Sequence, residues 1–381
     1  LGNSVLLLGA IASYQSTLSW HVVLGCLSLC LILSSLPLLQ LPATLHLAHN
    51  QMESALGQDY LSQIPREKRQ QLRSRPIVLR DLIQGIKMTD VQCDRHSLPI
   101  SNGTSLPLNL YHPPLKIQHP NSKIPNPNSK IPNPKPSSEA TQSDILKPSH
   151  PTLITFYGGG WHNGHPDETA DFSRYMAAQG YVVVAIAYRH APDHLFPTQL
   201  NDVQMALRWI VEHHTEYNID PSRVALVGWS AGAHLALLTA YQSHLWPSGL
   251  NIRAVANYYG PVDLAEGYRD LPHPDPIDGR AVLTDFLGGS PTEVPDRYRE
   301  ASPLYQIQAG LPSTLSIYGD RDHIVKPIFG QRLDQQLRQK GNHSILIRLP
   351  WAEHAFDKVS QGLGNQIALY YVERFFAWTL R

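Results

Sequence analysis

From residue 151 onward, apolar runs of strand length alternate with segments of helix length, and this alternation limits the folds open to the chain. Several runs are apolar throughout, as expected of strands buried on both faces. The runs lie at 152–157, 181–188, 223–228, 252–259, 313–319 and 344–350. The helix-length segments lie at 168–179, 198–214, 230–243, 326–340 and 362–379. The alternation predicts an α/β fold with a mostly parallel central sheet and helices on both faces.

The pentapeptide Gly228-Trp229-Ser230-Ala231-Gly232 follows one of these apolar runs and precedes the helix-prone sequence AHLALLTAY. It matches the pattern G-x-S-x-G in the strand–turn–helix context that presents a nucleophilic serine. The flanking glycines let the strand and the helix close around the serine. The helix N-terminus also favours negative charge that develops there. We therefore expect Ser230 to be a nucleophile.

A serine hydroxyl is a weak nucleophile until a base takes its proton, and the base needs an orienting acid. Candidates for both follow two later strands, in the order Ser, Asp, His that this class of fold uses. Asp320 and Asp322 come after the first of these strands, and His354 after the second. We expect His354 to be the base, whereas His323 reads as a surface loop residue. Spacing alone does not choose between the two aspartates.

Three consecutive glycines, from Gly158 to Gly160, come directly after the first apolar run. Acyl transfer builds an oxyanion that needs N–H donors. One donor comes from the residue after the nucleophile and another from the loop after an earlier strand. Glycines can bring backbone amides close to a substrate because no side chain intervenes. We expect the oxyanion hole to consist of Gly159, Gly160 and Ala231.

Five segments, taken in order, resemble the α/β-hydrolase fold in the esterase branch related to hormone-sensitive lipase and small carboxylesterases. They are YGGGW, AYRHAPDHLFPTQLNDVQMALRWI, GWSAG, GDRDHIV and EHAF. The resemblance extends from about residue 151 to residue 357. It implies a serine esterase that works without a cofactor. It also implies that Asp322, rather than Asp320, is the acid of the triad.

The chain departs from this family pattern at three positions. Tyr157 stands where the family usually has a His that shapes the loop. Trp229 stands where lipase-like members carry an acidic residue, and Ala233 where they often carry Gly. The departures at Trp229 and Ala233 favour the smaller-esterase and peptidase-like subgroups. The Pro- and Asp-rich segment 261–303 is expected to overhang the site and shape an acyl or alcohol pocket, the alternative being an ordinary surface crossover.

The first fifty residues contain no Lys, Arg, Asp or Glu. The apolar stretch 18–41 has about the length needed to cross a bilayer, and Trp20 at its edge suits the membrane interface. We expect a retained anchor that contacts membrane lipid. A cleaved signal peptide is the alternative, although no positively charged segment precedes the apolar core. The basic cluster at 66–75 favours a cytoplasmic catalytic domain by the positive-inside rule.

The expected organisation has three parts: a membrane segment at 1–50, a polar helical linker at 51–85 and the hydrolase domain at 86–381. Two extended segments, 86–93 and 105–111, open the hydrolase domain. The heptad NSKIPNP occurs twice within 121–134. Its composition cannot bury a core, and it predicts a disordered Pro/Asn-rich insertion at about 115–150.

Lys plus Arg equal Asp plus Glu, at 31 each, so no nucleic-acid partner is expected. The three cysteines and scattered histidines form no zinc pattern, and we expect no metal site. The leading hypothesis is hydrolysis of a small-molecule carboxylic ester through an acyl-serine. One alternative is an amide hydrolase with the same triad, either arylformamidase or peptidase-like. Another is a non-catalytic ligand-binding protein on this scaffold. No sequence feature predicts the oligomeric state.

Overall fold

The computed structural model describes residues 17–100, 103–114 and 149–381. Within them an eight-stranded sheet has the order β1-β2-β4-β3-β5-β6-β7-β8. Strands β3 to β8 pair in parallel, and β1 and β2 form an antiparallel edge. The strands are β1 (Cys93–Pro99), β2 (Ser105–Tyr111), β3 (His150–Phe156), β4 (Val182–Ile186), β5 (Ile219–Trp229), β6 (Ile252–Tyr258), β7 (Ser313–Gly319) and β8 (Ser344–Leu349).

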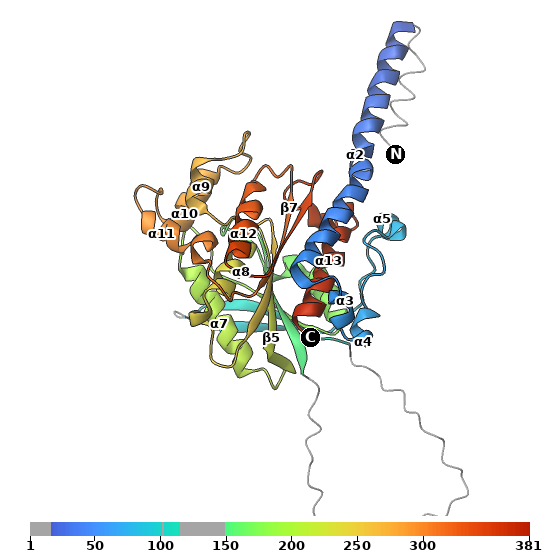
Figure 1. The fold of residues 1–381 in the computed structure, drawn as a ribbon. Coiled ribbons are helices and arrows are strands. Elements are labelled where there is room, and N and C mark those ends of the chain that lie inside the picture. The colour runs from blue at the N-terminus through green and yellow to red at the C-terminus, as the bar shows by residue number, and fades with distance from the viewer. Residues whose placement is uncertain (1–16, 101–102, 115–148) are drawn as a thin grey trace, which may run out of the picture.

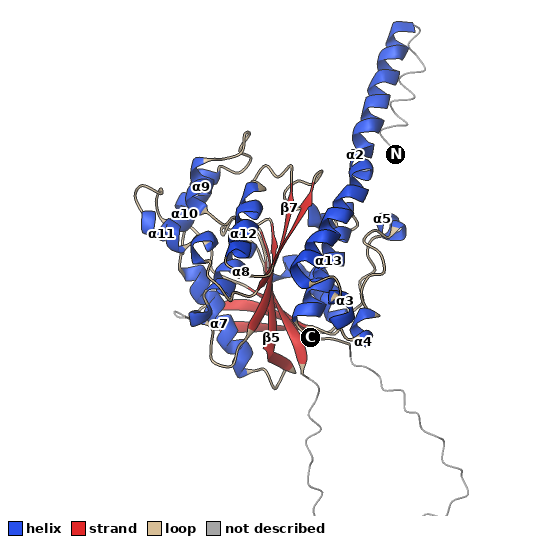
Figure 2. Cartoon of the chain, viewed as in Figure 1, coloured by secondary structure: helices blue, strands red, loops and turns tan. Residues whose placement is uncertain are grey.

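Helices cover both faces of this sheet (Figures 1 and 2). One face carries α7 (Thr198–Glu212), α8 (Ala231–Tyr241) and α12 (Ile328–Gln339). The other carries α6 (Ala170–Ala178), α13 (Leu363–Thr379) and the end of α2 (Thr17–Leu56). The remaining helices are α3 (Tyr60–Gln63), α4 (Arg66–Arg69), α5 (Leu79–Gln84), α9 (Leu264–Arg269), α10 (Gly279–Leu287) and α11 (Pro295–Glu300). Because both faces are covered, β4 is buried at every position.

The fold is therefore α/β with a mostly parallel sheet, as the alternation predicts. One strand differs from expectation. The extended segment expected at 86–93 meets the observed β1 only at Cys93. The reason lies in the position of β1 at the edge of the sheet, where Leu98 alone among its residues is buried. Such an edge strand contains few apolar residues, so an apolar run in the sequence does not indicate its position.

The N-terminal helix does not end where the membrane segment was expected to end. Helix α2 runs from Thr17 to Leu56 without a break, so the expected boundary at residue 50 falls inside it. Its last turns pack on the domain through a buried stripe with the i, i+4 spacing of one helix face. The stripe is Thr44, Ala48, Met52 and Leu56. One helix in the described residues, over 20–56, is long and apolar enough to cross a membrane.

The segment expected as a polar linker, 51–85, also packs on the hydrolase domain. Tyr60 and Ile64 are buried. The backbone N–H of Arg73 donates to Glu373 at 2.7 Å, and Trp378 donates to Gln63 at 3.0 Å. The polar groups of this segment form hydrogen bonds with α13 instead of with water. Composition cannot distinguish these two cases, and it therefore suggested a solvent-exposed linker. The expected insertion at 115–150, with its repeated heptad, lies almost entirely outside the described residues.

Candidate active site

Ser230 sits at a sharp turn between β5 and α8, in a backbone conformation that is rare for a residue with a side chain. Its φ is 53° and its ψ is −121°. Both flanking glycines are required by close packing. A Cβ on Gly232 would lie 2.2 Å from the carbonyl oxygens of Phe156 and Tyr157, and one on Gly228 would lie 2.4 Å from that of Gly232. The strain at Ser230 is thus held by its surroundings.

Ser230, His354 and Asp322 come together in one hydrogen-bonded chain. Nε2 of His354 lies 3.0 Å from Oγ of Ser230, and Nδ1 of His354 lies 2.7 Å from Oδ2 of Asp322. The Asp322 side chain is fully buried and that of His354 is 12% exposed. Oδ1 of Asp322 accepts from the backbone N–H groups of Ile324 and Val325, at 2.8 Å each. These bonds hold the carboxylate in the orientation that the imidazole needs.

The other candidates for the acid and the base lie elsewhere. Asp320 accepts a 2.7 Å bond from Nε of Arg348 on β8. His323 is half-exposed and pairs with Glu353 at 2.7 Å. That pairing raises the pKa of His323 above its ordinary value. Neither residue bonds to His354, so the geometry singles out Asp322.

The glycine loop faces Ser230 from the end of β3. Gly159 and Gly160 have φ values of 121° and 61°, which favour glycine. No hydrogen bond among the described residues engages their N–H groups. Ala231 opens α8, and the first N–H groups of a helix lack intrahelical acceptors. Gly158, Gly159, Gly160 and Ser230 line one cavity. The oxyanion hole at Gly159, Gly160 and Ala231 stays a prediction.

Tyr157 replaces the usual His and supports the loop from below. Its buried ring stacks on Tyr188 at 4.5 Å, and its hydroxyl lies 3.1 Å from Nε2 of His190. The neighbouring Arg189 makes a bidentate pair with the buried Asp202, with contacts of 2.6 to 3.1 Å. These contacts fix the β4–α7 loop against the glycine loop. They explain why Tyr can stand at this position.

Trp161 anchors the far side of the glycine loop. Its φ is 63°, and its ring stacks on Phe286 at 4.2 Å. Its indole N–H donates to Nδ1 of the fully buried His234 at 3.2 Å, and His234 bonds through Nε2 to the carbonyl of Ala301. Burial lowers the pKa of His234 to about 4. His234 is therefore a neutral structural residue on α8, directly behind Ser230.

Two cavities meet at Ser230. The larger, about 360 Å³, is lined by the glycine loop, Ser230 and His354. The smaller, about 70 Å³, is apolar and does not include His354 among its lining residues. The segment 261–303 supplies much of its wall, through Leu264, Leu271, Ile277, Val282 and Leu283. The segment is therefore part of the pocket rather than a plain crossover.

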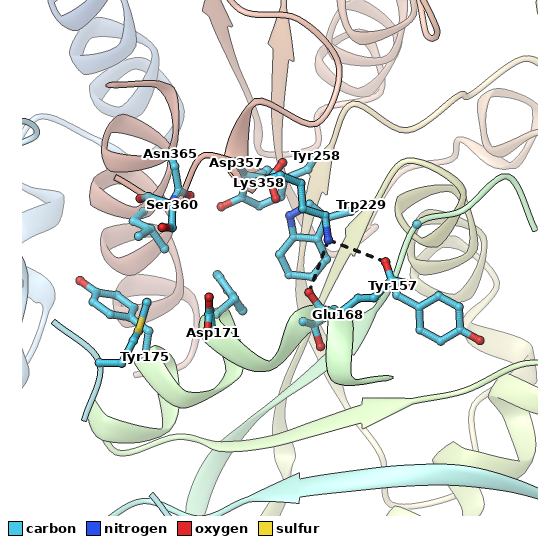
Figure 3. Close-up of a pocket in the computed structure, with 15 residues that line it drawn as sticks. Tyr157, Glu168, Asp171, Tyr175, Trp229, Tyr258, Asp357, Lys358, Ser360 and Asn365 are labelled. Carbon is cyan, nitrogen blue, oxygen red and sulfur yellow. Dashed lines mark hydrogen bonds and ion pairs between the residues drawn. The ribbon is translucent and has the colours of Figure 1, made fainter. Parts of the chain in front are cut away.

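A third cavity, of about 110 Å³, lies beside the 360 Å³ cavity, between α6 and α13 (Figure 3). Lys358 and Glu168 line both cavities and form an ion pair at 3.7 Å. Trp229 and Tyr258 also line the third cavity. The indole N–H and the phenol of these two residues have no hydrogen-bond partner within the described chain. The third cavity thus has two buried polar groups in its wall, next to the candidate active site.

Sequence reasoning missed Tyr259, which packs against His354, and Asp357, which bonds to Tyr259. The Tyr259 ring lies 4.5 Å from the imidazole, and its hydroxyl donates to Asp357. Burial raises the pKa of the Asp357 carboxyl. Asp357 follows His354 by only three positions, so the short EHAFD sequence could have suggested it. No motif in the surrounding sequence indicates a role for Tyr259. It comes directly after β6 and has a φ of 44°.

The sheet, the serine elbow and the Ser–His–Asp chain define the class of protein as an α/β hydrolase. Residues 142–337, just over half of the chain, match the BD-FAE family model. The chain belongs to the BD-FAE family.

Relatives and solved structures agree with the α/β-hydrolase class. The chain is 31% identical over 238 residues to the probable carboxylic ester hydrolase LipM of Mycobacterium tuberculosis, covering 60% of this chain and 54% of that protein. It is 32% identical to the esterase LipC of the same organism, covering 57% and 55%. The chain thus spans about half the length of these curated relatives. A bacterial heroin esterase shares the fold with a TM-score of 0.61, 23% identity, and coverage of 79% and 87%.

Proposed function

We propose that the chain is a serine hydrolase that cleaves carboxylic esters through an acyl-serine intermediate. One observation carries the proposal: Oγ of Ser230, the imidazole of His354 and the carboxylate of Asp322 form a continuous hydrogen-bonded chain at a strained strand–helix turn. Curated relatives that are named as esterases support an ester rather than an amide as the substrate.

In this mechanism His354 takes the proton of Ser230 while Oγ attacks the ester carbonyl carbon. The N–H groups of Gly159, Gly160 and Ala231 stabilise the oxyanion of the tetrahedral intermediate. His354 then gives its proton to the leaving alcohol. Water attacks the acyl-serine with His354 again as the base, His354 returns this proton to Oγ of Ser230 as the acyl–oxygen bond breaks, and the carboxylic acid leaves. Asp322 stays ionised and holds the imidazole in the required tautomer.

The two cavities at Ser230 suggest how the ester divides between them. The leaving alcohol must reach Nε2 of His354 to receive its proton, and only the 360 Å³ cavity has His354 in its wall. We therefore assign the larger cavity to the alcohol. The 70 Å³ apolar cavity beside Ala231 takes the acyl group, which favours a short acyl chain.

The free half of α2 supports a membrane anchor. Within the described residues over 20–41, large apolar side chains such as Leu24, Leu31 and Leu39 are 55 to 73% exposed. Such a surface is unfavourable in water by ~25 cal/mol per Å². The docked half of the same helix ties this segment to the hydrolase domain. We propose that this free half of α2 lies in the lipid bilayer.

A labelling experiment with a fluorophosphonate tests the enzymatic proposal. Wild-type protein should be labelled, and the Ser230→Ala variant should not. Esters of graded acyl length then test the cavity assignment, with acetate and propionate esters expected to give the highest kcat/KM. Absence of labelling in a folded wild-type protein would contradict serine catalysis and favour a binding role.

A further inference from the structure

The direction of α2 relates the anchor to the active site. The Ala55 carbonyl accepts from Nδ1 of His343, which comes directly before β8, at 2.7 Å. The Leu45 carbonyl accepts from the hydroxyl of Tyr371, midway along α13, at 3.1 Å. Going back along α2 toward its N-terminus therefore follows β8 from its amino end toward its carboxyl end. The carboxyl ends of the parallel strands, with Ser230 and His354, form what we call the catalytic edge.

The level at which α2 leaves the domain follows from element lengths. The six residues of β8 span about 20 Å, which corresponds to about 13 residues of helix. Thirteen residues before Ala55 is Pro42, which lies just N-terminal to Thr44, the first residue of the buried stripe. The apolar part of α2 before Pro42, residues 20–41, thus starts level with the catalytic edge and extends about 33 Å beyond it, against a hydrocarbon core of about 30 Å. Figure 1 shows this half projecting past the end of β7.

A second apolar group lies at the same edge. The backbone N–H of Val78 donates to Gln366, in the first turn of α13, at 2.8 Å, and α5 follows at once. Because α13 starts at the catalytic edge and runs away from it, α5 is held at this edge. Leu79 and Ile83, one helical turn apart, are 74% and 86% exposed, and Val359 is 57% exposed.

The charges around α5 match a membrane interface. Arg75, Arg80 and Lys87 are exposed and flank Leu79 and Ile83 in sequence. Apolar side chains with basic neighbours are the composition of segments that rest in the headgroup region of a bilayer. The apolar part of α2 starts at the same edge of the domain. A bilayer that α2 enters would therefore also cover Leu79 and Ile83.

We infer that the catalytic edge faces the bilayer, with Leu79, Ile83 and Val359 resting in its interface, and that the enzyme takes an ester dissolved in the membrane. The inference rests on the anchoring and the esterase activity proposed above. It deepens them because it names the substrate class as lipophilic esters. Ile277, which lines both cavities at Ser230, is 42% exposed and lies at the mouth through which such an ester would pass.

The test of orientation does not depend on catalysis. Full-length protein is reconstituted in phosphatidylcholine vesicles after its own cysteines are replaced by serine. A single Ile83→Cys or Leu61→Cys is then labelled with an environment-sensitive fluorophore. Leu61 is the matched control, because α3 lies at the other end of α13 and Leu61 is itself partly exposed. Lipid-borne quenchers should quench the label at position 83 and not that at 61. Equal quenching at both positions, or quenching at neither, would overturn the inference.

The test of substrate source uses the Leu79→Glu/Ile83→Glu double variant and the Leu61→Glu control. Hydrolysis of hexadecyl acetate in the vesicles should fall roughly tenfold in the double variant, because charged side chains are expelled from the interface. Hydrolysis of water-soluble 4-nitrophenyl acetate should not change, and Leu61→Glu should affect neither reaction. Equal rates for the double variant and wild type on the vesicle ester would overturn the inference. Failure of the wild type on every ester would instead contradict the esterase proposal, while the quenching result still decides the orientation.

Discussion

Asp320 and Arg348 form an ion pair at 2.7 Å between the end of β7 and β8, two residues from the aspartate that bonds to His354. The carboxylates of Asp320 and Asp322 are close in sequence but bind different partners. Asp320 braces two adjacent strands at the surface, and the buried Asp322 orients an imidazole. The spacing in the sequence leaves the two aspartates equivalent, but their partners do not.

This difference predicts the outcome of two isosteric substitutions. Asp322→Asn should lower kcat by about 10⁴, because an amide favours the wrong imidazole tautomer. Asp320→Asn serves as the control, since an exposed ion pair contributes about 0–1 kcal/mol and does not touch the imidazole. Steady-state hydrolysis of 4-nitrophenyl acetate measures both. The reverse ranking would move the acid to Asp320.

Removal of the nucleophile or the base should abolish turnover without unfolding the domain. Ser230→Ala and His354→Ala should each lower kcat by about 10⁶, since members of a triad act as a unit. The double variant should be no slower than either single one. Circular dichroism checks that the fold is retained. Near-normal turnover in either single variant would show that another residue carries the chemistry.

The close packing at the elbow predicts a large cost for one added methyl group. Gly232→Ala would place Cβ 2.2 Å from two carbonyl oxygens of the glycine-loop strand, so β3 or α8 must shift. We expect a loss of unfolding free energy well above the ~1 kcal/mol typical of a point substitution. Gly267→Ala is the control, because its Cβ would meet only ordinary contacts at 3.8 and 3.9 Å. Comparable urea midpoints for the two variants would contradict the packing argument.

The buried His234 predicts a specific loss of stability in acid. Burial lowers its pKa from 6.5 to about 4 in the folded state. The unfolded chain therefore binds the proton more readily, and stability present above about pH 6.5 is lost as the pH falls toward 4. The contribution is on the order of 3 kcal/mol. His234→Gln should lose less unfolding free energy than wild type between pH 7 and pH 4.5. Parallel pH profiles of the two proteins would exclude this source.

The docked half of α2 predicts where the chain can be shortened. A protein that begins at Pro42 keeps Met52 and Tyr60 against the domain and should be soluble, folded and active on a water-soluble ester. One that begins at Ser74 exposes the surface these side chains cover, at about 1.5–3 kcal/mol for each large apolar side chain. It should have a lower Tm or aggregate. Equal Tm values would show that residues 42–73 contribute nothing to stability.

Features that are local in sequence could be predicted, and features made by tertiary packing could not. The central strands and Ser230 are marked by apolar runs and by a short motif with its context. The choice of Asp322 required a family resemblance, because only contacts across the sheet distinguish it from Asp320. Ala233 illustrates the limit most plainly. A Cβ on Gly260 would lie 2.8 Å from the Cβ of Ala233, so the tolerance of Ala there depends on a glycine at a distant position.

The unbroken course of α2 also bears on how substrate would be found. A flexible linker would let the catalytic domain move freely above the membrane. A helix that spans the membrane and packs on the domain would instead fix the height and orientation of the domain. Ester molecules would then arrive by lateral diffusion within a plane rather than from bulk solution. The relevant concentration becomes the amount of ester per unit of membrane area, and the rate of turnover would follow the lipid composition around the enzyme rather than the total amount of ester in the sample.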